Sequence, residues 1–396
     1  MIDLYSKALN KSLKIDRIIG KIKGAQPGPT VVFFGGIHGN ENSGVFALKE
    51  VLYGLNSAHV KGTVYGISGN LQALRKQKRY IKQDLNRLWT KANIELIKLK
   101  KDLYADESEL LELLELLKDI LKNNNPPFYF IDLHTTSSKT LPFITINDAL
   151  INRKFSQQFP VPIVLGIEEY LTGPLLSYIN QLGYVSLGFE SGQHDDFSSI
   201  INHIAFVNLA LVFSGAVEKD SILDFSKHYE QLKRQAQQTF DVFEIVYTYK
   251  IKPNENFKML NGFKSFERIK KGVPLAISND FNITSPYKGS IFMPLYQKKG
   301  AEGFFIIRPI NSFFLKLSAI LRRLKTDSFL AILPGITWVD KNEGVLQVNL
   351  NVAKYFAKAL FHLLGYRSRQ ITKTHLRLNN RERVAKTSMY KKEPWY

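Results

Sequence analysis

The sequence predicts an α/β fold, in which a sheet is flanked by helices, followed by a smaller C-terminal all-β domain. Apolar runs alternate with amphipathic segments over the first 225 residues, as they do where strands and helices alternate. After about Asp220 the pattern changes to short strands separated by turns, which is typical of a small β domain. We therefore expect an α/β domain at 1–225, a β-rich domain at 226–345, and a helix with a basic tail at 346–396.

The first domain contains the clearest elements. Its most regular segment runs from Glu107 to Leu121, where glutamates interleave with leucines at helical spacing. That pattern predicts an amphipathic helix packed on a core, and it favours core packing over a dimer contact. The residues from Asn123 to Pro127 end this helix. We expect strands near 12–19, 30–35, 62–67, 128–133, 142–147 and 183–189, and helices near 43–54, 106–122, 151–159, 172–181 and 196–215.

The second half contains shorter elements. A polar helix is expected at 225–238, and an apolar-periodic helix at 352–364 precedes the basic tail. The strands expected between them lie at 241–250, 266–277, 289–294 and 303–307.

Composition limits the classes of function. The chain has 396 residues, 27 of them Phe and 18 Tyr, which is enough for a large core and two domains. It contains no Cys, so disulfides and thiolate metal sites are excluded. The N-terminus lacks the apolar stretch of a signal peptide, and the longest apolar helical run, near 204–213, is about half of the ~20 residues that a membrane span needs. We therefore expect a cytoplasmic protein without a membrane span.

The net charge of +19 raises the question of nucleic-acid binding. Residues 366–396 contain nine Lys/Arg and two Asp/Glu, and so contribute +7 of this charge. No zinc knuckle, RNP-type aromatic motif or helix-turn-helix pattern accompanies them. A solvated basic surface is favoured over a nucleic-acid or lipid contact.

Three apolar runs are each followed by polar groups that can bind a metal. Val31–Phe34 precedes His38 and Glu41, 128–133 precedes His134, and 185–189 precedes Glu190. In open α/β sheets, ligands bind beyond the carboxyl ends of the strands. A single histidine at the end of a strand is more often a surface or capped residue than a ligand, and Glu41 and Glu190 alone also fit an early-helix acid and a loop carboxylate. Their joint position at one sheet edge favours metal binding. Two histidines and a carboxylate, with a fourth position for water, predict one Zn²⁺ held by His38, Glu41 and His134, with Glu190 as general base.

A basic cluster at 75–89 contains a second candidate motif. Most of its lysines fit an exposed turn, but Asn86 and Arg87 stand side by side and are suited to clamping a carboxylate. Arginine offers a planar bidentate fork, and asparagine adds a neutral donor. Asp84 is placed to orient Arg87 or a ligand histidine.

Together these motifs resemble the succinylglutamate desuccinylase/aspartoacylase family, zinc-dependent amidohydrolases related to zinc carboxypeptidases. The resemblance covers about residues 20–220 and rests on four ordered motifs, which are His38-Gly39-Asn40-Glu41, Asp84-Leu85-Asn86-Arg87, Asp132-Leu133-His134-Thr135-Thr136 and Glu190-Ser191-Gly192. It implies a zinc-carboxypeptidase-like mixed sheet whose site is covered by the smaller β domain. It also implies His38, Glu41 and His134 as zinc ligands, Glu190 as base and proton shuttle, Asn86 and Arg87 as the grip on the substrate α-carboxylate, and Arg79 as the group that polarises the scissile carbonyl.

Two further substrate contacts are weaker candidates. The resemblance implies a tyrosine from the β domain, for which Tyr296 is the candidate, although an ordinary surface tyrosine is the stronger explanation. His194 is a candidate for contacting substrate, or for capping the helix that follows it.

The predicted activity is hydrolysis of the amide bond of a small N-acyl amino acid. The alternatives are a zinc carboxypeptidase acting on short peptides and, from a different class, a basic nucleic-acid-binding or interaction protein. The sequence predicts neither the acyl group nor the oligomeric state, for which a homo-oligomer is one of the alternatives.

Overall fold

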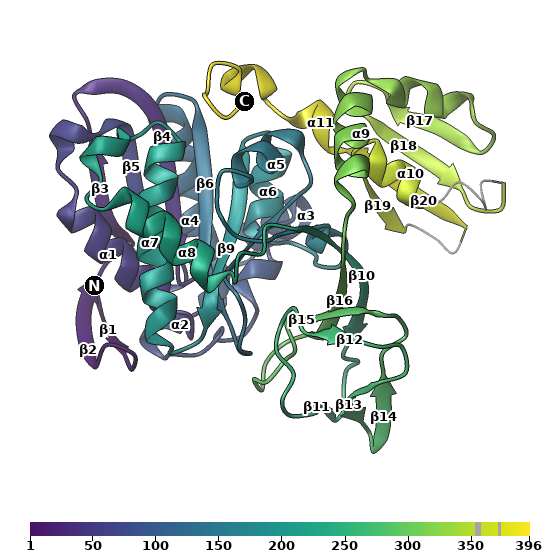
Figure 1. Cartoon of the computed structure of the whole chain (residues 1–396), viewed down its shortest axis with the longest axis horizontal. Helices are drawn as coiled ribbons and strands as arrows, with labels where there is room; N and C mark the ends of the chain where they lie inside the picture. Colours follow the sequence, from purple (N-terminus) through teal and green to yellow (C-terminus); the bar gives the residue numbers. More distant parts are fainter. Residues whose placement is uncertain (353–357, 371–373) are drawn as a thin grey trace.

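The computed structural model describes residues 1–352, 358–370 and 374–396, and its centre is a mixed sheet of eleven strands (Figure 1). The sheet strands are β3 (Ile18–Lys23), β4 (Gln26–Gly35), β5 (Lys61–Ser68), β6 (Phe128–Thr136), β7 (Phe143–Ile146), β8 (Ile163–Leu165), β9 (Val185–Gln193), β10 (Val242–Lys250), β12 (Arg268–Ile269), β15 (Gly289–Phe292) and β16 (Glu302–Pro309). Their spatial order is β12-β15-β16-β10-β8-β7-β9-β6-β4-β5-β3. Strands β5, β4, β6 and β9 are mutually parallel. The predicted α/β fold class is confirmed.

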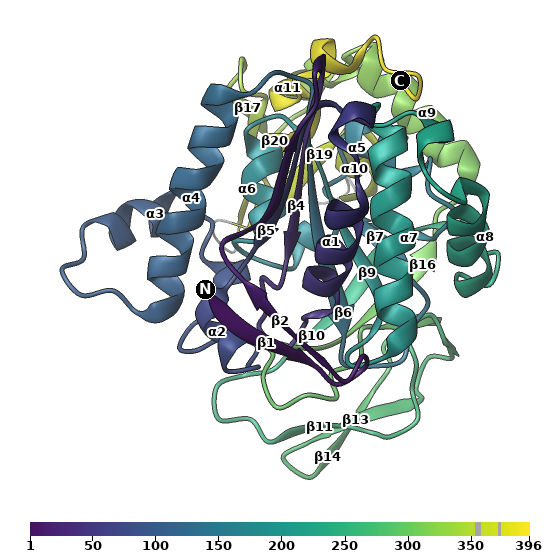
Figure 2. The same cartoon turned by 90° about the vertical axis from the view of Figure 1, so that its left-hand side faces the viewer.

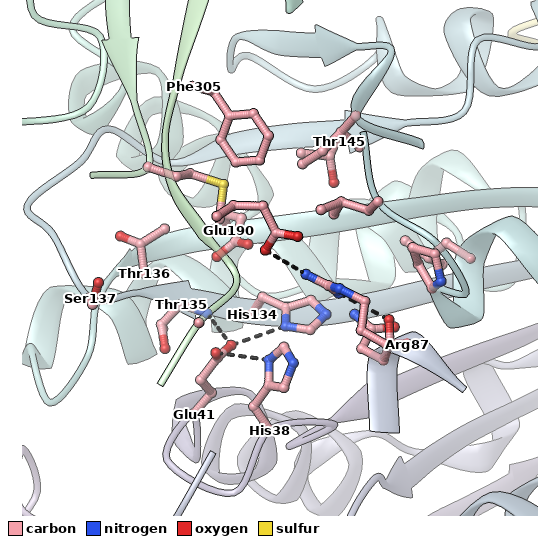
Figure 3. A pocket seen from close by; sticks show the side chains of 18 of the residues that line it. His38, Glu41, Arg87, His134, Thr135, Thr136, Ser137, Thr145, Glu190 and Phe305 are labelled. Carbon is pink, nitrogen blue, oxygen red and sulfur yellow. Dashed lines mark hydrogen bonds and ion pairs between the residues drawn. The ribbon is translucent and has the colours of Figure 1, made fainter. Parts of the chain in front are cut away.

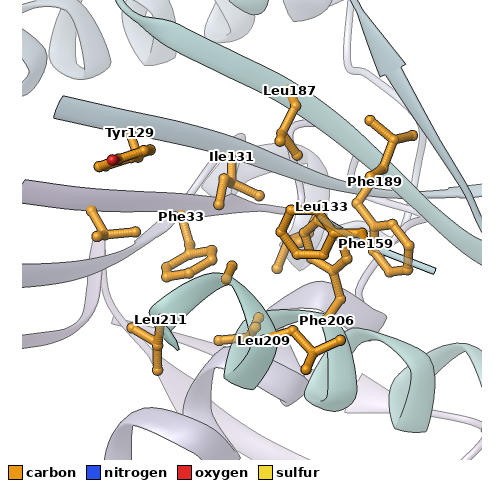
Figure 4. Close-up of a cluster of buried hydrophobic side chains, with 14 of the residues drawn as sticks. Phe33, Tyr129, Ile131, Leu133, Phe159, Leu187, Phe189, Phe206, Leu209 and Leu211 are labelled. Atoms are coloured by element: carbon orange, nitrogen blue, oxygen red, sulfur yellow. The ribbon is translucent and has the colours of Figure 1, made fainter. Parts of the chain in front are cut away.

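The parallel strands form from continuous apolar runs because both faces of the sheet are covered. Successive side chains of a strand point to opposite faces. In β4, Val31 and Phe33 therefore join one buried cluster, and Val32 and Phe34 join the other. Figure 4 shows the first cluster, in which side chains of β4, β6 and β9 meet a helix that carries Phe206, Leu209 and Leu211.

Helices cover the two faces in separate groups. One face is covered by α1 (Ser43–Gly54) and α7 (Phe197–Phe213), with α8 (Phe225–Gln235) packed on α7 (Figure 2). The other is covered by α3 (Lys91–Lys98), α4 (Ala105–Asn123) and α6 (Leu175–Gln181). The short helices α2 (Leu71–Arg75) and α5 (Leu150–Ser156) lie in the connections. In the part of the chain that the structure describes, no helix has the length and apolar character to cross a membrane.

At the N-terminus the structure differs from the sequence expectation. The single strand expected at 12–19 is two strands, because β2 (Lys11–Ile15) pairs with β1 (Ile2–Ser6) in a hairpin while β3 joins the main sheet. The chain changes sheets at Asp16 and Arg17, and the Arg17 backbone carbonyl accepts the Ser68 N–H. Both halves have the same apolar character, so the sequence pattern alone does not separate them.

The β-rich region is continuous with the main sheet. Strand β10 pairs in parallel with β8, and β16 and β15 extend the sheet from β10. The strand expected at 266–277 is divided between β12 in the main sheet and β13 in a second sheet, because a turn with Gly272 at φ +86° separates them. That second sheet contains β11 (Phe257–Met259), β13 (Pro274–Ser278) and β14 (Phe281–Thr284). The division at residue 225 remains a prediction.

The C-terminal region contains more regular structure than a helix and a tail. A four-stranded antiparallel sheet in the order β17-β18-β20-β19 packs with helix α9. Of the helix expected at 352–364, residues 353–357 lie outside the described part of the chain, 358–363 form α10, and Val352 and Leu364 lie in turns. The elements are α9 (Ser312–Arg323), β17 (Ile336–Asp340), β18 (Val345–Asn349), α10 (Lys358–Leu363), β19 (Tyr366–Gln370), β20 (His375–Asn380) and α11 (Arg381–Val384).

The last residues return to the central sheet and pack on it. Tyr390 is fully buried, and its hydroxyl donates to the Phe128 carbonyl at 2.5 Å and accepts the Val185 N–H at 3.0 Å. Trp395 is 8% exposed and contacts the rings of Tyr129 and Phe155. These contacts close the amino-terminal ends of β6 and β9.

Removing the Tyr390 hydroxyl should therefore destabilise the protein. In Tyr390→Phe, the Phe128 carbonyl and the Val185 N–H lose their buried partner, which should lower the free energy of unfolding by about 1–3 kcal/mol. Urea denaturation measures the change. Tyr53→Phe is the matched control, because that ring is 72% exposed; equal stability of the two variants would contradict the assigned role of the hydroxyl.

Candidate metal centre

Two of the predicted ligands lie in the loop that follows β4. Gly36 begins this loop in the left-handed region, at φ +74°. Gly39 packs so closely on α2 that a Cβ there would lie 2.0 Å from the Ala73 carbonyl carbon. These glycines allow the loop to fold against α2 and to present His38 and Glu41 on the same side.

The three predicted ligands converge in a buried cluster. One potential ligand atom from each of His38, Glu41 and His134 lies within 4.8 Å of the other two (Figure 3). His38 Nδ1 is 2.9 Å from Glu41 Oε1, and His134 Nδ1 is 3.0 Å from Glu41 Oε2. The Thr135 N–H also donates to Glu41 Oε2, at 3.1 Å. The group predicted from the sequence is thus brought together by the fold.

A second layer of carboxylates orients both imidazole rings. His38 Nε2 lies 3.2 Å from Asp84 Oδ1, and His134 Nε2 lies 2.7 Å from Asp132 Oδ2. With Nε2–H donating to a carboxylate, the Nδ1 lone pair is free to bind a metal, an arrangement common around zinc. His38 Nδ1 is buried and lies close to Glu41 Oε1, but the geometry of the pair is not that of a hydrogen bond, and no other described residue bonds to this nitrogen. This donor set fits a divalent metal that prefers nitrogen and carboxylate ligands, such as Zn²⁺.

The electrostatics of the cluster are strongly coupled. Burial opposes the charged forms, but His38 and His134 lower the pKa of Glu41 well below its usual value. In the same way, Asp132 and Glu41 overcome burial and raise the pKa of His134 well above 6.5. The raised pKa of His134 favours its protonated form, so a metal that binds at this position competes with a proton.

Glu190 lies next to the ligands on the adjacent strand. It is the register partner of His134 in the parallel pair β6–β9, and it lines the same cavity. Its Oε2 is buried without a hydrogen-bond partner among the described residues. Burial, followed by the attraction of His134 and the repulsion of Glu41, leaves its pKa raised to about 8. A carboxylate with a pKa near neutrality can both accept and release a proton.

The predicted substrate residues of the 75–89 cluster also line this cavity. Arg79 lies 3.3 Å from Glu41 and 3.2 Å from Asp84. Asn86 Oδ1 accepts the Leu175 N–H at 2.9 Å, so its amide NH₂ is the group left to donate into the cavity. Arg87 pairs with Glu302 of β16 at 3.1 Å. Asp84 contacts the ligand His38 and Arg79, which is one of the two arrangements that the sequence suggested.

Asp106 of α4, which no sequence motif identifies as part of the site, holds the loop that carries these residues. Its carboxylate is fully buried and accepts the backbone N–H groups of Ile81, Lys82 and Gln83 at 3.1, 2.7 and 2.9 Å. An acidic residue in the first turn of a helix is ordinarily explained by the helix dipole, so this second role of Asp106 could not be predicted from the sequence.

Tyr296 and His194 lie outside the set of residues that line the cavity. The Tyr296 hydroxyl accepts the Phe263 N–H at 3.0 Å and donates to the Leu260 carbonyl at 2.9 Å, so it is held by the β-rich region itself. The substrate contact predicted for Tyr296 has no support in this arrangement. His194 contacts Thr135 Oγ1 at 2.7 Å and Asn40 at 3.4 Å, and burial lowers its pKa. His194 thus contacts Thr135, which follows the ligand His134, and Asn40 in the loop that carries His38 and Glu41.

The cavity has a volume of about 130 Å³, and its walls come from distant parts of the chain. The segment from Met293 to Phe305 forms one wall, to which Gln297 and Glu302 contribute polar groups. Glu168 lines a different wall of the cavity. Sequence reasoning missed these three residues, because no local motif distinguishes them from surface residues.

Comparisons with known proteins agree with this architecture. Residues 27–204 match the model of the succinylglutamate desuccinylase/aspartoacylase catalytic domain. A probable aspartoacylase from Acaryochloris marina (strain MBIC 11017) is 34% identical over 129 residues, which is 31% of this chain and 40% of that relative. The match thus spans less than half of the relative's length.

Solved structures show the same fold at low identity. A succinylglutamate desuccinylase/aspartoacylase from Rhodobacter sphaeroides superposes with a TM-score of 0.56 at 16% identity, covering 74% of this chain and 88% of that chain. A succinylglutamate desuccinylase from Vibrio cholerae superposes with a TM-score of 0.53 at 15% identity, covering 78% and 96%.

The cluster should bind one divalent ion in competition with protons. We expect Zn²⁺ to raise the melting temperature of the wild type, with an affinity that increases with pH. Below the raised pKa of His134 the metal must displace a proton, so affinity should fall up to about tenfold for each pH unit below it. Calorimetric titration at several pH values measures this. His38→Ala should abolish high-affinity binding, whereas His59→Ala, which changes an exposed histidine, should not; equal affinity in both variants would exclude this site.

Proposed function

We propose that this chain is a zinc-dependent amidohydrolase acting on a small N-acyl amino acid. The match of residues 27–204 to the succinylglutamate desuccinylase/aspartoacylase catalytic domain supports this proposal. One observation carries the proposal. A buried His-Glu-His cluster shares its cavity with Glu190, a carboxylate whose pKa is raised to about 8. That combination is what metal-assisted hydrolysis of an amide needs.

The residues divide the chemistry between them. Zinc, when bound by His38, Glu41 and His134, would lower the pKa of its bound water to about 7 and polarise the amide carbonyl. Glu190 takes the proton of the attacking water and delivers it to the leaving amine. Because its pKa lies near neutrality, neither transfer requires a large free-energy change.

Arg79 is placed to stabilise the negative charge that develops on the carbonyl oxygen. Its guanidinium lies 3.3 Å from the ligand Glu41 and lines the cavity. Asp84 and Glu41 overcome the effect of burial and raise its pKa, so it stays charged. A donor of this kind contributes about 3–4 kcal/mol to transition-state stabilisation elsewhere.

Asn86 and Arg87 are proposed to hold the substrate's α-carboxylate. The Asn86 NH₂ and the Arg87 guanidinium donate from adjacent positions on one side of the cavity. Glu302 now accepts from Arg87 at 3.1 Å, so a substrate carboxylate would share or replace this acceptor. Fixing that end of the substrate brings the amide carbon to the reacting groups, which is the positional contribution to the rate.

The carboxypeptidase alternative would use the same metal centre. The cavity has a volume of about 130 Å³ and is bordered on one side by residues of the segment Met293–Phe305. No observation on the described residues favours a peptide over a small N-acyl amino acid, so we do not advance this alternative.

Glu190→Gln tests the proposed base. The amide of glutamine preserves the shape of the side chain but accepts no proton, so amide hydrolysis should fall by about 10²–10⁴-fold while zinc still binds. Stopped assays of N-acyl amino acid cleavage, together with zinc content, measure both properties. Glu50→Gln, at an exposed position, should retain full activity; activity in Glu190→Gln within a few fold of the control would refute the assignment.

Arg87→Ala tests the carboxylate clamp. Loss of the guanidinium should raise KM for free-acid substrates by roughly 10–100-fold, as expected for a lost charge-assisted hydrogen bond. Substrates with a methyl-esterified α-carboxylate should be affected much less. Arg75→Ala, at an exposed arginine, serves as the control. Equal losses for acid and ester would show that Arg87 has another role.

A further inference from the structure

Glu168 places a carboxylate with one unused oxygen in the wall of the cavity. It lies in the short helix Ile167–Glu169 that follows β8, and it is fully buried. Its Oε1 accepts the Asp148 N–H at 3.4 Å and pairs with Arg381 Nη2 at 2.7 Å. Its Oε2 is buried without a hydrogen-bond partner among the described residues.

The groups that border Glu168 in the cavity do not satisfy this oxygen. Asn147 and Ser177 line the same part of the wall, but they hydrogen-bond to each other at 3.3 and 3.4 Å. Arg381 approaches Glu168 from the C-terminal region and does not line this cavity. The two guanidinium groups that do line it, those of Arg79 and Arg87, are paired with other carboxylates.

A buried acceptor without a partner is costly, so the bound state is expected to supply one. A carboxylate oxygen only accepts hydrogen bonds, so its partner must donate. A second carboxylate on the substrate would be repelled here, whereas an ammonium group would form a charge-assisted hydrogen bond.

We propose that Glu168 determines specificity by selecting N-acyl amino acids that carry an ammonium group away from the scissile amide. The inference rests on the proposed amidohydrolase function and names the substrate class of that site. The ammonium nitrogen donates to Glu168 Oε2 while Arg381 holds the other oxygen. Substrates with an additional carboxylate at this end are disfavoured.

The first test compares probes that differ by one ammonium group. Nα-acetylornithine is paired with Nα-acetylnorvaline, and N-(4-aminobutanoyl)glycine is paired with N-butanoylglycine, which places the charge once on each side of the amide. Nα-acetylglutamate supplies the carboxylate in the same place. We expect kcat/KM for the ammonium member of at least one pair to exceed its neutral partner by about 10–100-fold, as a charge-assisted hydrogen bond supplies, with Nα-acetylglutamate the poorest probe.

The second test assigns the preference to Glu168. Glu168→Gln keeps an oxygen for Arg381 and should abolish the preference, with little change for the neutral probes. Glu169→Gln is the matched control, because Glu169 also contacts Arg381, at 3.0 Å, but lines the neighbouring cavity. Melting temperatures establish that both variants fold.

Binding measurements distinguish a failure of this inference from a failure of the proposed function. Calorimetry with the intact probes in the Glu190→Gln background measures recognition without turnover. Hydrolysis of the neutral probes without any ammonium preference, in rate or in binding, would overturn the role of Glu168 and leave the amidohydrolase intact. Tight, Glu168-dependent binding of an ammonium probe that the wild type never hydrolyses would keep the specificity site and refute the proposed reaction.

Discussion

The rest of the site depends on the contacts of one buried group, the carboxylate of Glu41. It is buried against His38, His134, Arg79 and the Thr135 N–H, which come from three separate segments of the chain. A buried charge is tolerated only when several partners compensate for its lost hydration. The loop after β4, the end of β6 and the loop at 79–87 are therefore fixed relative to one another by one side chain.

Further carboxylates hold the groups that surround Glu41. Asp84 and Asp132 hold the two imidazole rings, and Asp106 holds the backbone of the loop that supplies Arg79 and Asp84. The cavity thus has rigid walls near the ligands, whereas the opposite wall comes from β16 and the segment before it. Replacing one of these acids by a neutral residue would affect positions in several elements at once.

The sequence predicted the parts of the molecule that local pattern determines. The apolar runs of β4, β6 and β9 identified the parallel strands, and the order of His38, Glu41, His134 and Glu190 along them identified the group that the fold brings together. Strand β8 was missed because three residues show no periodicity, and with it the pairing that joins β10 to the main sheet. Glu168 and Glu302 were missed because their importance arises only from tertiary contacts with Arg381 and Arg87. Tyr296 was chosen by resemblance, and its hydroxyl hydrogen-bonds to backbone groups of the β-rich region, so its contact with substrate stays a prediction.

The return of residues 390–395 to the central sheet has a consequence for biosynthesis. Tyr390 bonds to Phe128 and Val185, which precede it by 262 and 205 residues. During translation, the amino-terminal ends of β6 and β9 therefore stay uncovered until Tyr390 and Trp395 have been synthesised. Such distant contacts slow folding, because a long loop must close before they form. A chain that stops before Tyr390 would leave the Phe128 carbonyl and the Val185 N–H without this buried partner and would uncover the ring of Tyr129.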